Sequence, residues 1–230
     1  MAFTEKDYKS WKKNELGPND TFTFSCKMCG GCCRKREEPI LMTGSDIFRI
    51  AQALEQPVVD VIQKYMATYI GESSHIPLIV LMERDDGSCK LLRKGHCMVQ
   101  QNKPAVCALF PLGRYFDTSE NQFHYFYNER SCKEGADNGK VWTLQQWKNE
   151  FHLDETENMS AAWSRLMTGI AEITHKMPKD KIKDDFFYAL FWALYLEYDV
   201  SKPYIPQVEH RMTEVQELFA KEFHKRIKFS

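Results

Sequence analysis

Eight cysteines are the residues best suited to chemistry in this chain of 230 residues. All of them lie between residues 26 and 132, and four fall within eight consecutive positions. The chain shows no apolar leader, so we expect a cytoplasmic protein in a reducing compartment, where structural disulfides are rare. Thiols in such a compartment are more often metal ligands or catalytic groups. The cysteines therefore predict a metal site in preference to a disulfide scaffold or small core residues.

The first four cysteines form the string CKMCGGCC from Cys26 to Cys33. Two residues between thiols allow both sulfurs to face one metal across a tight turn. Two glycines permit positive φ, so backbone amides can point at sulfur. Neighbours in extended backbone point to opposite faces, and we therefore expect Cys32 and Cys33 to serve two centres, or to supply one ligand and one supporting thiol.

Four further cysteines complete the candidate ligand set. The predicted metal ligands are Cys26, Cys29, Cys32, Cys33, Cys89, Cys97, Cys107 and Cys132. Eight thiols could fill two four-thiolate sites, or hold one [4Fe–4S] cluster with four thiols to spare. The expected cofactor is thus an iron–sulfur cluster or zinc. Either centre carries a charge of about −2. Basic residues such as Lys27, Arg36 and Lys103 could balance that charge or be ordinary solvated surface residues.

The composition narrows the class of protein further. Hydrophobic residues make up 43% of the chain, enough for a core, and the net charge of −1 argues against a dedicated nucleic-acid binder. The most apolar run, residues 186–196, is far shorter than the roughly 20 residues that cross a bilayer, so no membrane partner is expected. The sequence does not identify a protein or small-molecule partner.

The elements that must position the cysteines follow from hydrophobic periodicity and turn signals. The predicted strands cover residues 21–24, 76–82, 88–92, 112–117 and 123–127. The second and third are expected to pair through the turn at residues 85–87. The predicted helices cover residues 46–54, 58–65, 144–147, 155–176, 181–198 and a segment after Pro206. Ser45 is the expected N-cap of the helix at 46–54, and Thr143 is the expected N-cap of the helix at 144–147. The aromatic-rich helix from residue 186 is expected to be central and buried.

These elements predict an α+β fold that is mostly helical. A small, irregular β part around the cysteine metal site would pack on a C-terminal helical part. We expect residues 1–230 to form a single body, with a cysteine-cluster metal-binding part at 20–135 and a helical part at 140–230.

The cysteine string, together with Pro104-x-x-Cys107-x-x-Phe110-Pro111, resembles the CxxCxxCC or YkgJ-type family of predicted zinc- or iron-chelating domains. The resemblance covers roughly residues 26–132. The chain departs from the family pattern at Lys103 and Ala108, where arginines are usual. Among relatives, the resemblance extends distantly to flagellin lysine N-methylases, which implies an iron–sulfur cluster.

Three functions are compatible with these observations. The favoured hypothesis is a metal-binding protein of unassigned physiological role that holds an iron–sulfur cluster or zinc. The first alternative is an iron–sulfur-dependent protein-modifying enzyme similar to a lysine N-methylase, which rests on family analogy. The second alternative is a structural module in which zinc staples a loop-rich segment for interaction with a partner.

Overall fold

A computed structural model describes residues 5–34, 36, 39–128, 132–137, 139–154, 157–178, 182–224 and 227. The helices are α1 (Glu5–Lys13), α2 (Gly44–Leu54), α3 (Val58–Tyr65), α4 (Ala105–Leu109), α5 (Lys133–Ala136), α6 (Leu144–Glu150), α7 (Glu157–Thr174), α8 (Asp184–Phe191) and α9 (Tyr204–Phe223). Short turns of 3₁₀ helix form η1 (Gly31–Cys33) and η2 (Gln100–Asn102), and η5 (Trp192–Leu196) is a π-helical turn that continues α8.

The strands are short and form several small antiparallel sheets. They are β1 (Glu15–Leu16), β2 (Thr21–Phe24), β3 (Met66–Ile70), β4 (Pro77–Leu81), β5 (Leu92–Arg93), β6 (His96–Cys97), β7 (Leu112–Asp117), β8 (Gln122–Tyr127) and β9 (Lys140–Thr143). One sheet has the order β1-β8-β7, and the others are the pairs β2–β9, β3–β4 and β5–β6. The fold is therefore mixed α+β and mostly helical, as predicted.

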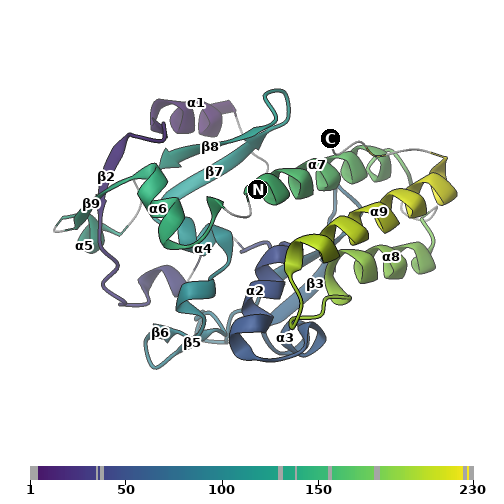
Figure 1. Cartoon of the computed structure of the whole chain (residues 1–230), viewed down its shortest axis with the longest axis horizontal. Coiled ribbons are helices and arrows are strands. Elements are labelled where there is room, and N and C mark those ends of the chain that lie inside the picture. The colour runs from purple at the N-terminus through teal and green to yellow at the C-terminus, as the bar shows by residue number, and fades with distance from the viewer. Residues whose placement is uncertain are drawn as a thin grey trace.

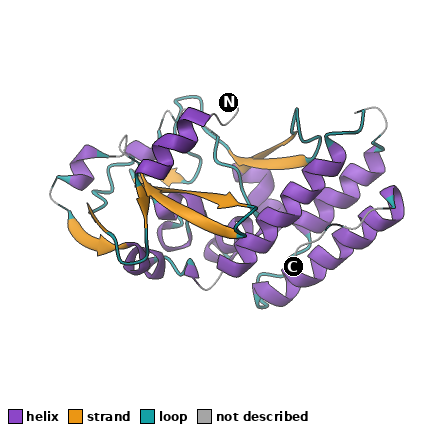
Figure 2. Ribbon diagram, turned by 90° about the horizontal axis from the view of Figure 1, so that it is seen from above, coloured by secondary structure: helices purple, strands orange, loops and turns teal. Residues whose placement is uncertain are grey.

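Figure 1 shows two ends of the molecule with different character. Helices α7, α8 and α9 lie together at one end with α2 and α3 beside them, and Figure 2 shows the same helical end from above. Strands β7 and β8 lie at the other end with α1 and α6. Each end has its own apolar core.

The larger core joins elements that are distant in sequence. It contains Ile47 and Ile50 of α2, Val61 of α3 and Ile79 of β4, together with buried residues of α7, α8 and α9. The same core also includes Cys89 and its near neighbours in sequence Leu91, Leu92 and Val99. The last helix presents one apolar face to this core, since Val208, Met212, Val215 and Phe219 are buried and Leu218 and Phe223 pack against the core.

The smaller core is aromatic and lies beside the cysteines. Phe22 and Phe24 of β2 pack edge-on against Trp147 of α6, with ring centroids 5.7 Å apart in both cases. Leu109 of α4 and Phe151 complete this side of the cluster. The Trp147 indole donates a hydrogen bond of 3.0 Å to the Leu109 carbonyl, so α6 holds α4 in place.

Two predictions of local structure need correction. The return strand at 88–92 is wrong, because β4 already has a partner on each edge: β3 pairs with one edge, and residues 40–42 bond to the other. The predicted turn at residues 85–87 does form, but the segment after it makes only isolated bridges, from Cys89 to Glu83 and from Ser88 to Arg34. The Lys90 amide also donates a 3.0 Å hydrogen bond to the Met82 carbonyl. The cap of α2 is Thr43, not Ser45, and it forms a reciprocal capping box with Asp46.

The remaining helices agree with the sequence pattern except at their ends and on one face. Helix α3 has the predicted bounds, and Thr143 caps α6 with a capping box. The predicted starts at residues 155 and 181 lie outside the described residues. The aromatic-rich helix is not buried on every side, since Tyr188 is 73% exposed and Trp192 is 53% exposed.

No helix in the described ranges has the length and apolar character needed to cross a bilayer.

Candidate metal centre

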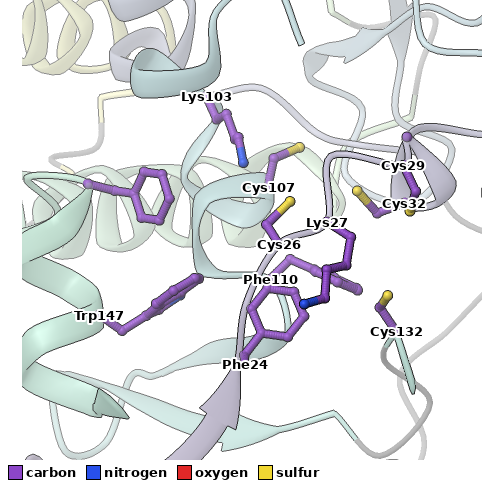
Figure 3. Close-up of a pocket in the computed structure, with 12 residues that line it drawn as sticks. Phe24, Cys26, Lys27, Cys29, Cys32, Lys103, Cys107, Phe110, Cys132 and Trp147 are labelled. Carbon is purple, nitrogen blue, oxygen red and sulfur yellow. The ribbon is translucent and has the colours of Figure 1, made fainter. Parts of the chain in front are cut away.

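Five of the eight cysteines line one small cavity beside the smaller, aromatic core. They are Cys26, Cys29, Cys32, Cys107 and Cys132. They come from three separate stretches of the chain, and Figure 3 shows their side chains around the same space. The cavity has a volume of about 50 Å³. The sequence-predicted ligands are thus partly gathered at one place by the fold.

The loop of residues 26–33 folds back on itself through its glycines. Gly30 has φ of +71°, a left-handed conformation that glycine adopts without strain, and η1 begins at Gly31. The Gly31 amide points toward the Cys29 sulfur at 3.5 Å, as expected for a turn that presents amides to thiolates. Gly30 also packs closely on the β5–β6 hairpin, because a methyl group there would lie 3.3 Å from Leu92.

The adjacent cysteines do not point to opposite faces, which corrects the sequence expectation. The 3₁₀ turn brings the sulfurs of Cys32 and Cys33 to 3.8 Å from one another. Cys32 lines the cavity, whereas Cys33 packs against the larger core.

The other three cysteines lie on the side of the larger core. Cys89 is buried in it, and Cys33 and Cys97 pack against it. The Cys89 amide donates a 2.8 Å hydrogen bond to the Cys33 carbonyl. Cys97 pairs with Leu92 in the β5–β6 hairpin. The structure therefore brings Cys33, Cys89 and Cys97 to one region, but they do not line the cavity.

Cys107 is positioned by a buried carboxylate that the sequence reading missed. Pro104 precedes α4, and the Ala105 amide in the first turn donates a 2.7 Å hydrogen bond to Asp46 Oδ1. Asp46 Oδ2 accepts from the backbone amide and hydroxyl of Thr43 at 3.0 and 2.8 Å. One carboxylate thus ties the start of α2 to the helix that carries Cys107. The Thr-x-x-Asp pattern of a capping box was the available signal.

Two lysines line the cavity with the cysteines. The Lys103 ammonium lies 5.2 Å from the centroid of the Phe151 ring, and Figure 3 shows it beside Cys107. Lys27 also borders the cavity and is exposed to solvent. Arg36 is already paired, because its Nε lies 2.9 Å from Glu83 Oε1. Of the cations predicted to balance the centre, Lys27 and Lys103 are therefore those placed at the cavity.

The environment changes the acidity of several thiols. A hydrogen bond from the Cys33 thiol lowers the pKa of Cys32 to about 6, and the positive charges of Lys103 and Arg36 act in the same direction. The same contact, with burial, raises the pKa of Cys33. Burial also raises the pKa of Cys97 and of Cys107. Cys32 is thus the readiest thiolate, and the more buried thiols must lose protons to bind a metal.

The donor set fits a thiophilic metal, whereas the spacing of its atoms does not match a single tetrahedral ion. With Zn–S bonds of about 2.3 Å, tetrahedral sulfurs lie about 3.8 Å apart. Cys32 and Cys33 match one such edge. Within the described residues, no three cysteine sulfurs lie within 4.8 Å of one another. The cavity sulfurs therefore surround a space larger than one ion occupies.

A separate group of metal-capable side chains consists of Asp117, Glu120 and His124. The His124 ring is buried between two carboxylates, pairing with Glu15 through Nδ1 and with Glu120 through Nε2 at 3.0 Å. Both ring nitrogens are thus occupied by pairs that join β1 to β8 and its hairpin.

Comparison with known proteins addresses the cysteine-bearing segment only. No curated protein and no solved structure gave a significant match to the chain. Residues 25–133 match the model of the CxxCxxCC family, whose description is "Putative zinc- or iron-chelating domain".

Proposed function

We propose that this protein binds a metal centre through the cysteines that line its cavity, and that the centre is an iron–sulfur cluster. The observation that carries the proposal is the convergence of five thiols from residues 26–32, 107 and 132 on one space. Thiolates are the ligands of zinc and of iron–sulfur clusters. The family match over residues 25–133 supports the same class of metal.

The spread of the sulfurs favours a cluster over a single zinc ion. A cluster distributes its four thiolate bonds over several iron atoms, so its ligands lie further apart than the ligands of one ion. The described cysteines show only the Cys32–Cys33 contact at zinc-like spacing. Zinc remains the second candidate because of that contact.

The charge at the cavity suits either centre. Four thiolates around a zinc ion or an oxidised [4Fe–4S] core carry a net charge of about −2. Lys27 and Lys103 supply two positive charges at the cavity wall. Burial of such a centre is favourable only when cations or donors compensate it, and these lysines provide that compensation.

The size of the cavity favours a binding role over the enzyme hypothesis. Sites for small organic molecules usually measure about 300–1,000 Å³. The thiol-lined cavity, at about 50 Å³, is several times smaller and suits an inorganic centre. The lysine N-methylase analogy has no support from a match to a curated protein.

Anaerobic purification of the full chain followed by iron, sulfide and zinc analysis tests the proposal. An iron–sulfur protein should be brown, absorb near 400 nm and contain equal amounts of iron and sulfide. Metal content with zinc alone would replace the cluster by the zinc alternative. Protein that contains less than about half an equivalent of either metal, even after reconstitution with iron, sulfide or Zn²⁺, would refute metal binding.

A further inference from the structure

The eight thiols fall into two overlapping groups. The outer group comprises Cys26, Cys29 and Cys132, which line the cavity. The inner group comprises Cys33, Cys89 and Cys97, which lie in or against the larger core. Two further cysteines, Cys32 and Cys107, also line the cavity, and Cys32 stands next to the inner group as well.

The inner group is held together by backbone contacts. The Cys89 amide bonds to the Cys33 carbonyl at 2.8 Å, and the Leu92 amide bonds to the Cys89 carbonyl at 3.0 Å. Leu92 in turn pairs with Cys97 across the hairpin. Three positions separated by up to 64 residues in sequence are thus fixed as near neighbours. If Cys33, Cys89 and Cys97 only filled space in the core, alanine or valine could take their positions.

Cys32 connects the two groups. The sulfur of Cys32 is 3.8 Å from that of Cys33, while Cys32 itself borders the cavity. The two groups of thiols are therefore neighbours that meet at Cys32.

We propose that the chain holds two metal centres, an outer one at the cavity and an inner one bound by Cys33, Cys89 and Cys97. Cys107 lines the cavity and completes the outer set of four thiolates, and Cys32, whose sulfur touches that of Cys33, completes the inner set. This inference rests on the proposed function, since it requires that thiolates bind metal here. It also gives the adjacent cysteines a role, because their 3.8 Å contact matches the spacing of two thiolates at one centre.

Metal content of paired variants tests the number of centres. The inner variant is Cys89→Ala with Cys97→Ala, and the matched outer variant is Cys26→Ala with Cys29→Ala. Each full-length variant is reconstituted anaerobically beside the wild type, in one arm with Zn²⁺ alone and in the other with iron and sulfide. We expect each double variant to retain about half of the wild-type metal, because one four-thiolate site stays intact.

A second measurement does not depend on whether the variants fold. Wild-type protein is alkylated with and without metal, and the modified cysteines are mapped by mass spectrometry. Two centres predict that metal protects Cys33 and Cys97 of the inner group as well as Cys26 and Cys29 of the outer group.

The outcomes separate the inference from the proposed function. Wild-type protein without metal refutes the proposed function. Metal-loaded wild type with unchanged content in the inner variant, or with unprotected Cys33 and Cys97, overturns only the inner centre. Complete metal loss in both variants, with helical content retained in the circular dichroism spectrum, indicates one centre shared by all thiols and also overturns it.

Discussion

Replacing Asp46 by alanine tests how the fold positions the thiols that line the cavity. The Asp46 carboxylate is 3% exposed and accepts hydrogen bonds from the Thr43 amide and hydroxyl and from the Ala105 amide. Loss of the capping interaction costs about 1 kcal/mol. Leaving the Ala105 amide without its acceptor costs a further 1–3 kcal/mol, roughly. We therefore expect Asp46→Ala to lower the free energy of unfolding by about 3 kcal/mol.

The assay is urea and thermal unfolding followed by circular dichroism. For a chain of this size, a loss of about 3 kcal/mol lowers Tm by about 6–12 °C. Ser45→Ala is the matched control, because Ser45 lies beside Asp46 but does not cap the helix, and it should change stability by less than about 0.5 kcal/mol. The hydrogen bond from the Ala105 amide to Asp46 positions the helix that carries Cys107. Asp46→Ala should therefore also weaken metal binding, whereas Ser45→Ala should not. A difference of under about 1 kcal/mol between the two variants would refute this reasoning.

Three further results are expected. Gly30→Ala should lower the free energy of unfolding more than Gly95→Ala in the same assay, since both glycines have positive φ but only Gly30 has close neighbours. Equal losses of stability would show that packing at Gly30 is unimportant. The apparent affinity for Zn²⁺ should rise with pH from 6 to 8, because burial raises the pKa of Cys97 and Cys107 and each thiol must release a proton to bind metal. Calorimetry in buffers of different ionisation enthalpy counts the released protons. Binding without proton release would contradict the assignment of these two cysteines as ligands. Chelation of the metal should reduce hydrogen-exchange protection at residues 25–34 and in α4, while α7 and α9 stay protected. A uniform loss of protection would mean that the stability of the whole fold depends on the metal.

Local signals in the sequence were sufficient to predict several helices and strands correctly. Strand 21–24 alternates apolar and polar residues, and its two phenylalanines are buried as that pattern requires. Thr143 caps α6, with Gln146 completing the capping box. The α3 bounds follow from Pro57 before the helix and from its apolar spacing. In each case the deciding residues are neighbours in sequence.

The elements that were missed depend on distant partners. The β3–β4 pairing, which displaces the expected return strand at 88–92, is decided by competition for the edges of β4. Helix α4 has only five residues, too few for a periodic signal, and its position comes from Asp46 and Trp147. The cavity also has an aromatic wall, which consists of Phe24, Phe110, Trp147 and Phe151. This wall arises where β2, α4 and α6 meet.

The sequence predicted the type of site better than its arrangement. The cysteine string indicated a metal centre, and the cavity gathers five of the predicted ligands. The orientation of Cys32 and Cys33 was wrong because extended backbone was assumed where a 3₁₀ turn forms. That turn depends on the positive φ of Gly30, whose conformation is not determined by the neighbouring residue types alone.

The aromatic wall has a practical consequence for anyone who trims this protein. A fragment that stopped at residue 133 would contain every cysteine and the whole family match. It would nevertheless lack β9, which pairs with β2, and Trp147, which both borders the cavity and fastens α4. It would also uncover the larger core, to which α7, α8 and α9 contribute buried residues. Such a truncated product should aggregate and bind metal poorly despite its intact thiols, so the recombinant protein has to extend through α9.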